Sequence, residues 1–89
     1  MELDEEFITK TATELFLAKM IAIYAGVLTG KQVAAAHRCV VEKLCKDKKS
    51  WDLFACVVDG MHMVYSKARE LGFERAMKEI TCEEYLKYV

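Results

Sequence analysis

Proline and asparagine are absent from this chain, Gln32 is its single glutamine, and only four of its 89 residues are glycine. Since proline and glycine interrupt helices most strongly, their scarcity favours long helices. It also excludes collagen-like and low-complexity chains, which are rich in these two residues. The absence of asparagine, with lysine and glutamate as the main charged residues, favours a thermophilic source.

The chain also lacks an excess of charge of either sign, since its formal net charge is −1. A near-neutral chain is not drawn as a whole to nucleic acid or to an anionic membrane. Hydrophobic residues make up 54% of the sequence, which excludes an intrinsically disordered chain. We expect residues 1–89 to form one domain, whose surplus of apolar residues favours a core shared with another chain.

No long hydrophobic run is present. The longest one, residues 15–28, is interrupted by Lys19 and is shorter than the roughly 20 residues that span a bilayer. The first six residues include four acidic and no basic side chains, whereas a secretory signal begins with basic residues. We therefore expect no membrane association and a cytoplasmic location.

The remaining residues predict an all-α fold. A capping box at Thr29 and Gln32, a Ser50 N-cap and a glycine stop at Gly72 divide the chain into helices. The helices are expected over residues 4–25, 30–46, 51–71 and 73–80, with a further turn or two beyond a second capping box at residues 81–84. Short connections favour an antiparallel bundle of three main helices with a short C-terminal helical appendage, completed by dimerisation.

The first predicted helix has two apolar lines. The line expected to face the chain's own core contains Phe7, Ile8, Thr11, Leu15, Ala18, Ala22 and Ala25. The second line, expected to meet a second copy, contains Phe16, Met20, Ile23 and Val27, and the tail residues Tyr85 and Tyr88 are expected to join it. A helix that is apolar nearly all round needs cover on more than one side.

Charge is distributed unevenly along the chain. Residues 1–30 carry two basic and five acidic side chains, residues 31–50 six and two, and residues 51–89 five and seven. The basic patch consists of Lys31, Arg38, Lys43, Lys46, Lys48 and Lys49. It is either a phosphate-contacting surface or a solvated face, or it meets the acidic N-terminus of another protomer.

Groups that could support catalysis are few. His37 lies within the apolar stripe of its helix and is interpreted as a core histidine, because no second ligand follows at the next helical turn. Asp59 and His62 have the carboxylate–histidine spacing of di-iron bundles. Glu14 and Glu42 are the only mid-helix candidates for the partner glutamates, and the second copy of the motif would have to come from a homodimer, so an ordinary surface pair is favoured. No nucleophile pair or phosphate-binding loop is evident, so we expect no metal, no cofactor and no enzymatic activity.

The chain has four cysteines, which are Cys39, Cys45, Cys56 and Cys82. Their spacing includes no CxxC pair and therefore predicts no zinc site. In an ordinary cytosol they would stay reduced and act as small core residues, whereas in a hyperthermophile they could form disulfides.

These observations favour a small non-enzymatic helical module for protein–protein interaction that self-associates, most simply as a homodimer. The alternative is a nucleic-acid-associated accessory protein that uses the basic patch of residues 31–50.

Overall fold

The computed structural model describes residues 4–80 and residue 82, and this part of the chain is helical and contains no strand. The segments are α1 (Glu5–Ile23), α2 (Gly30–Cys39), the π-helical segment η1 (Val40–Leu44), α3 (Ser50–Leu71) and α4 (Phe73–Glu79). The prediction of an all-α fold is therefore confirmed. Among the described residues, no helix combines the length and the apolar character needed to cross a membrane.

Two of the predicted helix ends are confirmed. The Thr29 hydroxyl accepts a 3.2 Å hydrogen bond from the Gln32 N–H, and the Gln32 side chain accepts a 2.9 Å bond from the Thr29 N–H. Gly72 ends α3 with a φ of 86°, which a residue with a side chain adopts only at a cost. The second capping box, residues 81–84, lies largely outside the described residues.

One predicted end is wrong. Ser50 does not cap α3 with its side chain: Lys49 occupies the N-cap position, and Ser50 is the first helical residue, with a φ of 53°. The cap comes instead from the start of α1. The Glu5 carboxylate accepts a 2.6 Å hydrogen bond from the Ser50 N–H and a second bond from the Ser50 hydroxyl.

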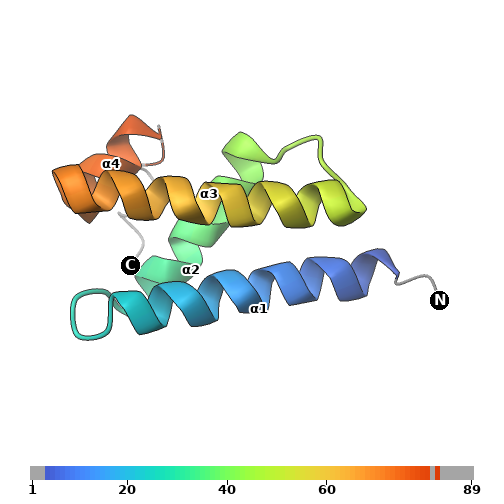
Figure 1. Ribbon diagram of the computed structural model, residues 1–89, viewed down its shortest axis with the longest axis horizontal. Coiled ribbons are helices and arrows are strands. Elements are labelled where there is room, and N and C mark those ends of the chain that lie inside the picture. Colours follow the sequence, from blue (N-terminus) through green and yellow to red (C-terminus); the bar gives the residue numbers. More distant parts are fainter. Residues whose placement is uncertain (1–3, 81, 83–89) are drawn as a thin grey trace.

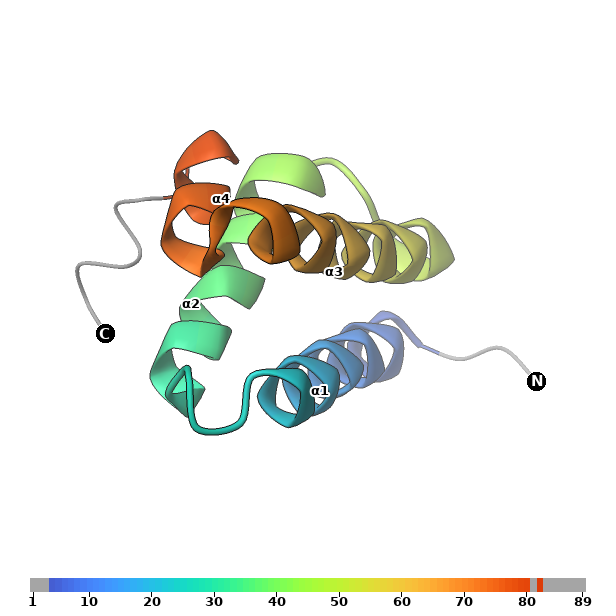
Figure 2. The ribbon, with the colours of Figure 1, turned by 60° about the vertical axis from the view of Figure 1, so that its left-hand side comes forward.

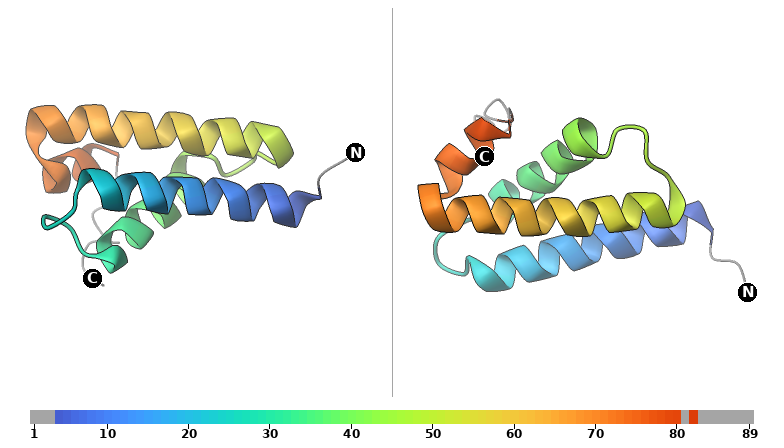
Figure 3. Two further views of the ribbon diagram at one scale, coloured as in Figure 1. Left: turned by 60° about the horizontal axis from the view of Figure 1, so that its bottom comes forward. Right: turned by 45° about the horizontal axis from the view of Figure 1, so that its top comes forward.

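The helices form two layers. Helices α1 and α3 lie side by side and run in the same direction, and the largest contact between helices joins them (Figure 1). Helix α2 and η1 cross behind this pair obliquely, and α4 folds back beside the end of α3 on the same side (Figures 2 and 3). The predicted bundle of aligned antiparallel helices is thus not confirmed.

The core lies between the two layers. It is built mainly from apolar side chains of α1, α2, η1 and α3, closed at one end by α4. Its members are Ala12, Phe16, Met20, Val33, Ala36, Cys39, Val40, Cys45, Val57, Met61, Val64, Met77, Ile80 and Cys82. Near the C-terminal end of α3, an ion pair of 2.8 Å between Lys67 and Glu79 joins α4 to α3.

The assignment of the faces of α1 differs from the sequence prediction. Phe16 and Met20, which were expected to meet a second copy, are 1% and 0% exposed and belong to the core. Phe7, which was expected to be covered, is 50% exposed. The periodicity of an almost uniformly apolar helix does not distinguish its inner face from its outer face. Packing against α2 and η1 therefore determines which face of α1 is buried.

The turn of π-helix was not predicted, and it is the place where the two layers come closest. A Cβ atom on Gly60 of α3 would lie 2.5 Å from the Cγ1 atom of Val40. A glycine in the middle of a long helix costs about 1 kcal/mol relative to alanine, and from sequence its expected role is the close approach of a neighbouring helix. In the structure this approach is the crossing, which leaves no room for a side chain.

Disulfides join η1 to its surroundings at both of its ends. Cys39, just before η1, is bonded to Cys82, and Cys45, just after it, is bonded to Cys56 of α3. The Cα atoms of the two pairs are 5.9 and 5.8 Å apart, within the usual range for a disulfide. The reduced cysteines expected for an ordinary cytosol are therefore not what the structure contains.

The crossing predicts a sharp response to one methyl group. Gly60→Ala should lower the free energy of unfolding by about 1–3 kcal/mol, because the new Cβ forces Val40 and η1 away from α3. Gly30→Ala is the matched control, since a Cβ there meets nothing within 4 Å. Denaturant unfolding followed by circular dichroism measures both. If Val40→Ala added to Gly60→Ala restores no stability, the clash is not the cause.

Candidate interaction surface

Among the described helices, none covers the outer side of the α1–α3 pair, because α2, η1 and α4 all lie on the other side (Figures 1 and 2). A groove of about 460 Å³ runs along this face between the two helices. It is lined by Leu15, Lys19 and Ile23 of α1 and by Val58, Met61, His62 and Tyr65 of α3. We call this set the α1–α3 groove.

Apolar side chains are also exposed near the start of both helices. In α1, Leu15, Lys19 and Ile23 line the groove at intervals of four residues, and because each such step turns by about 40° around the helix axis, Phe7 lies on another side of the helix than Ile23. Phe7 is 50% exposed and Ile23 is 47% exposed. At the start of α3, the indole of Trp51 is 56% exposed and packs edge-to-face against Phe54 at 5.5 Å. Apolar surface is thus exposed beyond the groove itself.

Of the interface residues predicted from sequence, Phe16 and Met20 are buried in the protomer's own core, so that part of the prediction is wrong. Ile23 lies in the groove. Val27 is 73% exposed in the turn after α1, and Tyr85 and Tyr88 lie outside the described residues. The groove residues of α3 were not predicted as part of an interface. Their signal was the adjacent apolar pair Val57 and Val58, which gives α3 an apolar stripe wide enough for two faces.

The basic patch of residues 31–50 does not form one uniform surface. Lys31 and Arg38 lie on the exposed side of α2, seven residues apart, while Lys46, Lys48 and Lys49 occupy the exposed turn before α3. Lys43 lies between them in η1 and is engaged in an interaction.

The turn with the last three lysines adjoins the acidic start of α1. Glu5 is bonded to Ser50 and is also attracted by the charge of Lys49, and Asp4 and Glu6 flank Glu5 in the chain. The sequence also allowed the patch to meet the acidic N-terminus of another protomer. In the structure, Glu5 of the same chain lies near Lys49 and offsets part of the charge at this end of the patch.

His37 is half-buried at the contact of α2 with α1. Its ring meets the Phe16 ring edge-on at 5.1 Å, and its Nε2 atom is buried without a hydrogen-bond partner. Burial lowers the pKa of His37, so the neutral imidazole is favoured. This position fits the interpretation of a core histidine.

Tyr24 has a similar position at the other end of the core. Its hydroxyl is buried without a partner, and its ring packs against Phe73 of α4 at 5.7 Å. Burial raises the pKa of Tyr24, and the neighbouring Tyr65 adds to the shift.

The Asp59 and His62 pair lies on the exposed part of α3, and His62 also borders the α1–α3 groove. Among residues 4–80 and 82, no group of three or more histidine, cysteine or carboxylate side chains could hold a metal ion. The main feature that the described residues offer is the α1–α3 groove.

Comparison of the chain with models of protein families, with curated proteins and with solved structures found no match.

The Glu5 cap makes a prediction for pH. Hydrogen bonds from the Ser50 hydroxyl and from the Ser50 N–H, with help from the Lys49 charge, lower the pKa of Glu5 from its ordinary value of 4.5. A lowered pKa in the folded state adds stability that is fully present above 4.5 and is lost as the pH falls through the folded-state pKa. Glu5→Gln should therefore be less stable than the native chain at neutral pH.

The difference should shrink towards zero once the pH lies below the folded-state pKa of Glu5, because the native carboxyl is then also uncharged. Urea midpoints of both proteins across the acidic range measure it. Glu6→Gln is the matched control, since Glu6 precedes Phe7 in the same exposed turn and makes no bond to Ser50. A gap for Glu5→Gln that is independent of pH would contradict the assignment.

Proposed function

We propose that this protein is a non-enzymatic helical interaction module that self-associates as a homodimer through the outer face of the α1–α3 pair. The observation that carries the proposal is the α1–α3 groove, an apolar channel on the one side of the helix pair that no described segment covers. Stacking the two pairs face to face would give a four-helix core between the copies. The bundle expected from sequence is then a property of the dimer.

A second copy suits this face because the groove is mainly apolar, with Leu15, Ile23, Val58, Met61 and Tyr65 in its lining. A two-fold axis brings the same surface against itself, and an apolar surface is complementary to its own copy. The surplus of apolar residues in so short a chain supports the same partner.

The alternative, an accessory protein that binds nucleic acid through residues 31–50, has less support. Phosphate contacts need basic side chains whose charge is available. The charge of Lys49 is partly offset by the carboxylate of Glu5, and Lys31 and Arg38 lie on α2, apart in the chain from the turn with Lys46, Lys48 and Lys49.

A cytoplasmic location and a thermophilic source remain part of this proposal and support each other. Disulfides are rare in the cytosol of mesophiles but frequent in intracellular proteins of hyperthermophiles. The absence of asparagine fits the same source. A secreted or periplasmic location would account for the disulfides without it.

The chain offers a matched pair of variants to test the dimer. Ile23 and Ile21 lie on the same helix and are 47% and 48% exposed, but only Ile23 lines the groove. Ile23→Glu should weaken self-association by about 100-fold or more, because a carboxylate would be buried between the copies. Ile21→Glu should leave it unchanged. Sedimentation equilibrium measures both, and circular dichroism checks that each variant keeps its helices.

A native chain that stays monomeric at high concentration would reject the homodimer. A native dimer that neither variant weakens would reject this face as its interface. Met20→Glu is not a suitable probe, since Met20 is fully buried in the core and its replacement would unfold the protomer.

A further inference from the structure

The two disulfides differ in how a reductant can reach them. Cys39 and Cys82 are both 0% exposed. In the second pair Cys45 is 1% exposed, but Cys56 lies at the surface of α3 and is partly exposed. Thiol–disulfide exchange requires a thiolate to reach one sulfur atom, so access controls its rate.

We propose that the two disulfides form a two-step redox response in which Cys45–Cys56 opens first, within the folded protein, and Cys39–Cys82 opens only when α4 separates from α2. This inference is independent of the proposed dimer. Cys56 is not among the groove residues, so a second copy on the outer face would leave it accessible.

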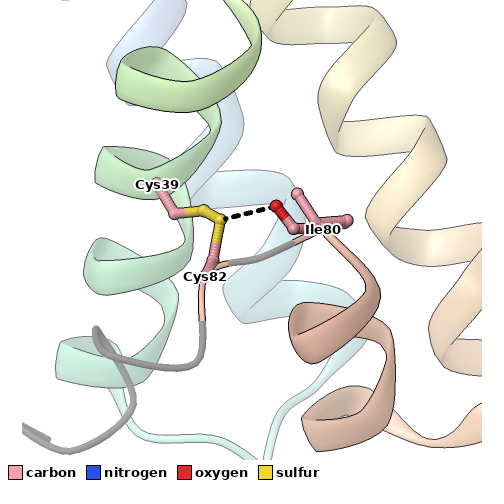
Figure 4. Close-up of a disulfide and its surroundings, with 3 residues drawn as sticks. All are labelled: Cys39, Ile80 and Cys82. Carbon is pink, nitrogen blue, oxygen red and sulfur yellow. Dashed lines mark hydrogen bonds between the residues drawn. A yellow bond between two sulfur atoms is a disulfide. The ribbon is translucent and has the colours of Figure 1, made fainter.

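The buried disulfide lies within the core cluster. Cys39 projects from α2 towards Cys82, which follows α4, and the carbonyl oxygen of Ile80 lies 3.3 Å from the Cys82 Sγ atom (Figure 4). Ile80 is only 7% exposed, and both cysteines belong to the same core cluster as Val33 and Met77. A reductant therefore has no route to either sulfur unless this end of the core opens.

The accessible disulfide encloses a different part of the chain. Cys45 and Cys56 are 11 residues apart, and between them lie the lysine-rich turn and the first turn of α3. The Cys45 N–H closes the π-helical turn by a 3.1 Å bond to the Val40 carbonyl, and Glu5 holds Ser50 from outside the loop. These bonds and the Val40–Gly60 contact do not involve sulfur, so the fold should survive the first step.

The chemistry of the first step is ordinary exchange with a dithiol. One thiolate of the reductant attacks Cys56 Sγ, the S–S bond breaks, and the Cys45 sulfur leaves as a thiolate and takes up a proton. The second thiol of the reductant then displaces Cys56 from the mixed disulfide. The protein gains two electrons and two protons, and the reductant becomes its cyclic disulfide.

The sole tryptophan of the chain, Trp51, lies inside the 45–56 loop and is 56% exposed. Its fluorescence therefore reports on the first step, while far-ultraviolet circular dichroism reports on the helices.

The test is a time course of the native protein with dithiothreitol, quenched by a maleimide and read by mass spectrometry after proteolysis. The expected result is an intermediate labelled at Cys45 and Cys56, with native helicity and altered Trp51 fluorescence. Labelling of Cys39 and Cys82 should be at least about 100-fold slower, because it needs local opening. In denaturant the two rates should converge.

Two double variants serve as matched controls. With Cys39→Ala and Cys82→Ala, the remaining disulfide should react at the rate of the first native step. With Cys45→Ala and Cys56→Ala, the remaining disulfide should resist the reductant while the helices persist. Simultaneous appearance of all four thiols in the native protein, or earlier labelling of Cys39 and Cys82, would overturn the proposal.

Discussion

The fold depends on the contact between η1 and α3, where Val40 lies against Gly60 with no space for a side chain. This contact sets the distance between the two layers, and disulfides bind the chain on both sides of it. A 10 kDa chain buries a limited core, so covalent links of this kind supply stability that packing alone does not provide. The extra residue per turn in a π-helix changes the direction of the side chains that follow it, so Val40 and Cys45 both face the interior.

The sequence predicted those features that local chemistry determines. The capping box at Thr29, the stop at Gly72 and the order of the helices follow from hydrogen-bonding groups and backbone freedom close to each site. The π-helical turn and the Glu5–Ser50 cap were not predictable in this way. The first depends on packing against another helix, and the second joins residues 45 positions apart. Both are consequences of the tertiary structure.

The candidate surface differs in its residues from the surface predicted from sequence. The excess of apolar residues predicted that α1 needs cover on two sides, and in the structure apolar side chains of α1 line an open groove. Which side faces inward was decided by the shape of the core, where Phe16 and Met20 fill the space between α1 and α2 and η1. Leu15 and Ile23 were thereby left to the groove. The spacing of apolar residues along α1 does not show which helices pack against it, and those helices determine which face of α1 is buried.

The parallel course of α1 and α3 has an electrostatic consequence. The peptide dipoles of two helices that point the same way add, so positive potential gathers at the end where both helices begin. Asp4, Glu5, Glu6 and Asp52 lie at that end, and their carboxylates balance it. Two copies that met with their helix pairs antiparallel would cancel the remaining dipole, whereas copies aligned in parallel would double it. The parallel course of α1 and α3 therefore favours an antiparallel arrangement of the two helix pairs in the proposed dimer.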